Sequence, residues 1–176
     1  MGTRDRHPRP HWRTGCLSQA SSRMSASEAL TRLGIVLPPV ATPAGSYIPA
    51  SRHGDLVYTS GQLPMREGSL VAAGHLGAEV SVEDAAFAAR VAALNAVAAA
   101  ADVAGGIDNI TRVVRVVGYV ASAPDFTQQP AVMNGASDVL GEIFGEAGKH
   151  VRSAVGVAAL PLGAAVEVEL VVAVKD

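Results

Sequence analysis

The chain is poor in the residues that carry thiol, amine and metal chemistry. Its 176 residues include a single cysteine, Cys16, so no disulfide can form within one chain. Lys149 and Lys175 are the only lysines, which leaves almost no candidate for a Schiff-base mechanism. The five histidines show no H-E-x-x-H spacing, and with no cysteine pair beside them we expect no metal site.

Signatures of phosphate binding, acyl transfer and membrane insertion are also missing. Although the chain has 18 glycines, it contains no G-x-G-x-x-G, P-loop or G-x-S-x-G motif. The apolar stretches are broken by Asp, Asn, Arg or Gly before they reach the roughly 18 residues that a membrane span needs. We therefore expect a soluble, cytoplasmic protein that does not act on membranes.

Positive charge is concentrated at one end of the chain. Residues 1–23 contain five arginines and one aspartate, a net charge of +4, whereas residues 24–176 contain nine basic and fifteen acidic residues, a net charge of −6. The first segment lacks the apolar core of a secretory signal. We interpret residues 1–23 as a tail outside the fold, either disordered or placed before the true start at Met24, and residues 24–176 as one domain. A transit-like address is the alternative for the first segment. An acidic domain is a poor partner for nucleic acid.

The order of helical and strand periods predicts an α+β domain, with two main helices packed on one face of a mixed sheet. The long second helix is expected to lie on that sheet through one apolar stripe, whose members recur at helical spacing: Phe87, Val91, Leu94 and Ala98. The last two strands are expected to pair through a tight turn at Pro161 and Gly163. Helices are predicted over 27–37, 81–105 and from 130 onwards, and strands over 47–51, 55–63, 69–72, 110–120, 152–160 and 166–174.

Arg152 is the first candidate functional residue, because it shares one face of its strand with the small residues Ala154, Gly156 and Ala158. Small neighbours leave room for a ligand, and a guanidinium binds a carboxylate with two parallel hydrogen bonds. The structural alternative is an arginine at a strand end that reaches into solvent. Glu167 is either a solvated strand residue or a general base whose pKa is raised by partial burial.

Several segments together are similar to the reactive intermediate deaminase (RidA/YjgF) family. They cover residues 44–174 in order: Tyr58-Thr-Ser-Gly-Gln-Leu-Pro64, Asp125-Phe126, Asn134, Arg152-Ser-Ala-Val-Gly-Val-Ala-Ala-Leu-Pro161 and Val166-Glu-Val-Glu169. The resemblance implies a chorismate-mutase-like fold and a homotrimer with clefts between its subunits. It implies a hydrolase of the 2-iminobutanoate/2-iminopropanoate deaminase type, which converts 2-imino or 2-enamino acids to 2-keto acids and ammonia without a cofactor.

The resemblance also implies a role for each matching residue. Arg152 matches the arginine that holds the substrate carboxylate, and Glu167 the glutamate that orients or activates water. Tyr47, Ser60 and Asn134 match residues of the cleft, although turn and capping roles explain each of them equally well. Ala154 stands where the family often has cysteine, and there only its backbone would contact the substrate.

Two other functions compete with imine hydrolysis. A trimeric carboxylate-binding module without catalysis would use Arg152 but would not need Glu167. RNA cleavage has also been attached to the family, and the negative domain charge disfavours it. If the last two strands pair as expected, Arg152 and Glu167 lie roughly 20 Å apart in one chain, so a shared cleft would need two subunits.

Overall fold

The computed structural model describes residues 24–43 and 45–176, and the expected tail of residues 1–23 lies outside the described residues. The helices are α1 (Ala26–Leu33), α2 (Val82–Ala104) and α3 (Gln129–Phe144). The strands are β1 (Ala50–His53), β2 (Leu56–Thr59), β3 (Met65–Arg66), β4 (Ser69–Leu70), β5 (Ile110–Ala121), β6 (Val151–Val157) and β7 (Val166–Val174), and the short 3-10 helices are η1 (Ile107–Asn109), η2 (Gly145–Gly148) and η3 (Pro161–Gly163).

Five strands form the main sheet in the order β1-β2-β7-β5-β6, and β3 pairs with β4 in a separate hairpin. β6 runs parallel to β5, whereas the other pairs of the main sheet are antiparallel. The expected pairing of the last two strands is therefore wrong, because β7 inserts between β2 and β5. This placement suits the alternating valines of β7, since a central strand satisfies its backbone groups on both edges while one face enters the core.

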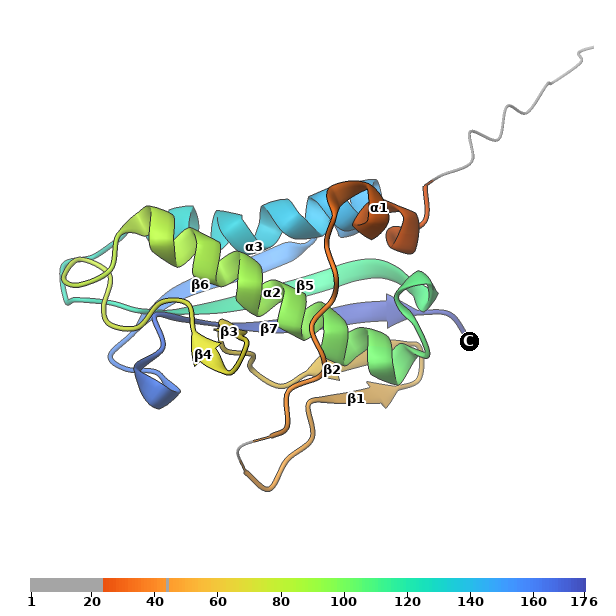
Figure 1. Cartoon of the computed structure of the whole chain (residues 1–176), viewed down its shortest axis with the longest axis horizontal. Helices are drawn as coiled ribbons and strands as arrows, with labels where there is room; N and C mark the ends of the chain where they lie inside the picture. Colours follow the sequence, from red (N-terminus) through yellow and green to blue (C-terminus); the bar gives the residue numbers. More distant parts are fainter. Residues whose placement is uncertain (1–23, 44) are drawn as a thin grey trace, which may run out of the picture.

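α2 and α3 lie side by side on one face of the sheet (Figure 1), so the predicted α+β architecture is confirmed. Val166, Val168, Leu170, Val172 and Val174 of β7 point into the core beneath these helices. Apolar residues of α3 also enter the core, where they are buried: Val132, Ala136, Val139, Leu140 and Ile143.

The expected orientation of α2 is wrong for the larger residues of the stripe, although Ala98 is buried as expected. Alanines of this helix are buried in the core, whereas Phe87 is 48% exposed and Val91 and Leu94 are half-buried. Small side chains let α2 approach its neighbours closely: at Gly135 of α3, a methyl group would overlap the backbone carbonyl of Ala86. Close packing is thus achieved mainly with alanine and glycine, while Phe87 and Val91 of α2 stay partly exposed.

The ends of the helices follow the sequence. The Ser81 hydroxyl accepts a hydrogen bond from the Asp84 backbone N–H (3.0 Å) and caps α2, which ends at Gly105 in the left-handed conformation (φ 76°). At 23 residues α2 is long and apolar enough to cross a membrane, which corrects the expectation that no apolar segment reaches that length. Because 61% of its most apolar window is buried inside the fold, we describe it as the core helix.

Candidate functional site

The Arg152 side chain lies against α3, where its guanidinium donates three hydrogen bonds. Nη1 donates to Asn134 Oδ1 (3.1 Å) and to Ser137 Oγ (2.9 Å), and Nη2 donates to the carbonyl oxygen of Pro130 (3.2 Å). All three acceptors are neutral. The structure thus brings together two of the residues singled out from the sequence, Arg152 and Asn134.

The hydrogen bonds leave Arg152 able to bind an anion. A guanidinium has five N–H donors, of which three are used here, so two remain for a ligand. Within the described part of the chain no carboxylate forms an ion pair with this arginine. A cavity of about 340 Å³ adjoins it, lined also by Ser137, Lys149 and His150. A guanidinium that is fixed in position, has two free N–H donors and borders a cavity is suited to bind a carboxylate ligand.

Ser137 and His150 were missed in the sequence analysis. His150 Nδ1 lies 2.6 Å from the carbonyl oxygen of Gly148, which can only accept, so Nδ1 carries the proton. In the neutral ring Nε2 is then the acceptor for the Ser137 hydroxyl, 3.0 Å away. The available signal was spacing, since Ser137 follows Asn134 by three residues on one helix face and His150 precedes Arg152 by two along the chain.

Glu167 lies on the opposite face of the sheet from Arg152. It pairs with Tyr119 of β5, whereas Arg152 pairs with the buried Val116 of the same strand. Residues three apart on a strand point to opposite faces, so the two side chains do not meet in one chain. The backbone register separates them by about 10 Å across the strands and about 10 Å along them, which replaces the estimate based on a hairpin.

The environment of Glu167 raises the pKa of its carboxyl group, first through partial burial and second through the negative charge of Glu169. Glu169 itself accepts a hydrogen bond from the Tyr119 hydroxyl (3.3 Å), and the pKa of Tyr119 is raised by burial and by that carboxylate. The Glu167 carboxylate rests against the Cα of Gly61, where any side chain would overlap it. A half-buried carboxylate with a raised pKa is a better proton acceptor than a solvated one.

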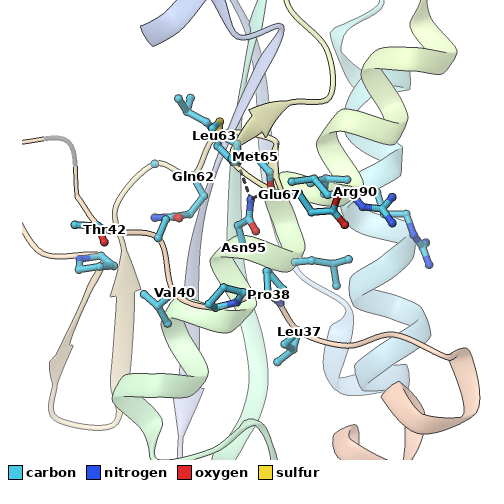
Figure 2. Close-up of a pocket in the computed structure, with 18 of the residues that line it drawn as sticks. Leu37, Pro38, Val40, Thr42, Gln62, Leu63, Met65, Glu67, Arg90 and Asn95 are labelled. Atoms are coloured by element: carbon cyan, nitrogen blue, oxygen red, sulfur yellow. Dashed lines mark hydrogen bonds between the residues drawn. The ribbon is translucent and has the colours of Figure 1, made fainter.

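Tyr47 and Ser60 line a second, larger cavity of about 860 Å³ between α2, the connector after α1 and the loop after β2 (Figure 2). Tyr47 is 52% exposed. The Ser60 hydroxyl donates to the Pro49 carbonyl oxygen (3.1 Å) and lies 3.3 Å from the side-chain nitrogen of Gln62, which donates to it. Ser60 therefore holds the turn, as the structural alternative proposed, and Tyr47 is open to the cavity.

Ala154 continues the face of β6 that carries Arg152, opposite Gly118 of β5. The predicted residues thus fall into two groups in one chain. Arg152, Asn134 and Ala154 lie at β6, which is one edge of the sheet, whereas Tyr47, Ser60 and Glu167 lie around the β2 and β7 side. Within the described residues no three His, Cys, Asp or Glu side chains are grouped to hold a metal ion.

The fold and these motifs define a class of protein: residues 27–174 match the family model described as "YjgF/chorismate_mutase-like, putative endoribonuclease". The chain belongs to this YjgF/Rid family, which confirms both the resemblance and the fold class expected from the sequence. The chain is 44% identical over 158 residues to Protein TCP17 of Trypanosoma cruzi, a match that covers 89% of this chain and 98% of that protein.

Two solved structures illustrate the relationship. A Shewanella oneidensis protein described as a "putative endoribonuclease" is 35% identical and superimposes with a TM-score of 0.82, over 85% of this chain and 99% of that one. E. coli TdcF, solved with bound serine, is 25% identical with a TM-score of 0.55, over 80% of this chain and 94% of that one.

Proposed function

We propose that the protein is a cytoplasmic hydrolase that deaminates reactive 2-imino and 2-enamino acids to 2-keto acids and ammonia, without a metal or organic cofactor. The observation that carries the proposal is the state of Arg152. Its guanidinium is fixed by three neutral acceptors, keeps two donors free and borders a cavity. The serine bound to E. coli TdcF has the carboxylate and the nitrogen-bearing carbon of such a substrate, which supports the proposal.

In the proposed reaction Arg152 holds the substrate carboxylate and so orients the neighbouring C=N carbon. Water adds to this carbon while Glu167 accepts one proton from the water, and the nitrogen takes up a proton to give a carbinolamine. The carbinolamine nitrogen then takes up a second proton, the C–N bond breaks with its electron pair going to nitrogen, and ammonia leaves. The hydroxyl gives up its proton as the keto group forms, so that the two protons lost by water are the two taken up by nitrogen. The overall balance is one imine and one water to one ketone and one ammonia.

The separation of the two groups supports a homotrimer with sites between its subunits. Because Arg152 and Glu167 point to opposite faces of one sheet, a shared site needs Arg152 from one subunit and Glu167 from another. Asn134 and the Ala154 backbone would then accompany Arg152, and Tyr47 and the Ser60 turn would accompany Glu167. A cyclic trimer repeats such a contact three times and closes it.

Mixing of two inactive variants tests this arrangement. Arg152→Ala and Glu167→Gln should each be inactive alone. When equal amounts are reassembled, one site in four should combine the intact Arg152 of one subunit with the intact Glu167 of its neighbour, so activity should return to about a quarter of wild type. Turnover would be followed by the disappearance of imine generated in situ by an amino-acid oxidase. Continued inactivity of the mixture, with subunit exchange verified by mass, would contradict a site shared between subunits.

Glu167→Gln also separates catalysis from simple binding. A deaminase variant should lose turnover by about 100-fold or more and still bind 2-oxobutanoate, since Arg152 is intact. A variant as active as wild type would show that Glu167 is not the base, whereas binding of 2-oxobutanoate by a wild type that turns over no imine would favour the carboxylate-binding module. The family description includes endoribonuclease, so the same preparations would be incubated with single-stranded RNA. The net charge of −6 on residues 24–176 leads us to expect no cleavage.

A further inference from the structure

The walls of the larger cavity are mainly apolar. Phe87, Val91 and Leu94 of α2 line this cavity. Leu37 and Val40 of the connector form part of its wall (Figure 2). Phe87 stays 48% exposed. An exposed phenylalanine beside two further apolar side chains of the same helix, on the wall of a cavity of about 860 Å³, marks a binding surface.

Two buried amides give the cavity a polar end. Gln62 and Asn95 are 6% and 8% exposed and are the buried polar side chains of the described residues. Asn95 Nδ2 donates to the carbonyl oxygens of Leu63 (2.9 Å) and Met65 (3.0 Å), and Gln62 Nε2 donates to Ser60. Their side-chain oxygens accept no hydrogen bond from the described residues. In the same part of the chain every fully buried side-chain oxygen has a hydrogen-bond partner, so these two oxygens are not fully buried. Both oxygens therefore reach open space, and both residues line this cavity.

The cavity adjoins the Glu167 half of the proposed site. Tyr47, Ser60 and Gly61 belong to its wall, and the Glu167 carboxylate lies against Gly61 from the other side. A single glycine thus separates the proposed base from the hollow. A substrate whose C=N carbon is near Glu167 could extend its side chain past Tyr47 into this space.

We infer that the cavity binds the side chain of the substrate, and that the protein acts on imino acids with large apolar side chains, those formed by oxidation of leucine, phenylalanine or tryptophan. This inference rests on the proposed function. The methyl group of 2-iminopropanoate would leave the cavity nearly empty, whereas burial of a leucine- or phenylalanine-sized side chain favours binding by about 10- to 100-fold. The free oxygens of Gln62 and Asn95 suit a side chain with one N–H donor, such as indole.

The experiment compares imines made in situ by amino-acid oxidases from alanine, leucine, phenylalanine and tryptophan. We expect kcat/KM for the three large imines to exceed that for 2-iminopropanoate by about tenfold or more. The Val91→Trp variant fills the cavity and should lower this ratio about tenfold. Asp102→Trp places the same indole on an exposed position of α2 outside the cavity and should keep the ratio. Because both kcat/KM values are measured on the same preparation, their ratio does not depend on the fraction of enzyme that is folded.

Binding provides a readout that does not depend on turnover. Calorimetry with 4-methyl-2-oxopentanoate and pyruvate should show about tenfold tighter binding of the larger keto acid, and Val91→Trp or the smaller change Leu94→Phe should remove that difference. Equal affinity for both keto acids, unchanged in these variants, would overturn the inference even where small imines are hydrolysed. Selective binding of the larger keto acid without hydrolysis of any imine would uphold the cavity and reject the deaminase.

Discussion

Arg152 and Glu167 project from opposite faces of one sheet, in register with Val116 and Tyr119 of the strand between them. Arg152 is held on the helical face by α3, and Glu167 lies on the other face against Gly61. In one chain the carboxylate-binding cation and the proposed base are thus two separate half-sites. This geometry makes the proposed chemistry depend on assembly.

Ser137→Ala is expected to weaken substrate binding without a large change in kcat. The substitution removes an acceptor from the Arg152 guanidinium and the hydroxyl that faces His150, and one such hydrogen bond contributes about 1 kcal/mol. We expect KM to rise by roughly 3- to 10-fold, measured with the imine that the wild type hydrolyses best. The exposed Ser69→Ala of β4 serves as a control, and an unchanged KM for Ser137→Ala would show that Arg152 does not need this anchor.

The rate should depend on the ionisation of Glu167. Burial and the Glu169 charge raise the pKa of Glu167 above its ordinary value of 4.5, so kcat/KM should rise with pH through a midpoint above that value, as the carboxyl becomes a base. Glu169→Gln removes the repulsion and should move the midpoint to lower pH. A pH–rate profile of both proteins checks this, and identical midpoints would leave burial as the sole cause.

The ionised carboxyl group of Glu167 should lower the stability of the folded protein at neutral pH. Since its pKa is higher in the folded than in the unfolded chain, the folded state holds the proton more tightly, and stability is lost as pH rises from the unfolded pKa through the folded one. Glu167→Gln stays uncharged and should therefore have a higher Tm than wild type at pH 7. The difference should vanish below about pH 4, where both states are protonated. A lower Tm of the variant at pH 7 would contradict the raised pKa.

Two glycines of α3 should respond in opposite directions to alanine. Gly135→Ala would overlap the Ala86 carbonyl of α2 and should lower the free energy of unfolding by about 1–3 kcal/mol. At Gly141 of the same helix a methyl group meets no atom within 4 Å, so Gly141→Ala should raise it by about 0.5–1 kcal/mol. Urea unfolding of both variants measures the two changes in the free energy of unfolding. Equal changes would argue against close contact between α2 and α3 at Gly135.

Much of the fold was predictable because local signals agree with it. Ser81 and Gly105 bound α2, the alternating valines define β7, and apolar residues of α3 enter the core. The motifs also identified the family. Local patterns did not indicate that Ser137 and His150 meet beside Arg152, because that contact joins a helix to the start of a strand.

The sequence by itself determined the element types, their order and the chemistry available, since these follow from side-chain period, capping residues and residue type. Only the tertiary structure decided that β7 lies between β2 and β5 and that Phe87, Val91 and Leu94 of α2 line a cavity. The physical reason is that strand pairing and helix orientation are selected by packing among distant segments. From the sequence alone, either the alanines or the larger residues of α2 could have faced the sheet. In the structure the alanines do, and Gly135 of α3 packs closely against Ala86 of α2.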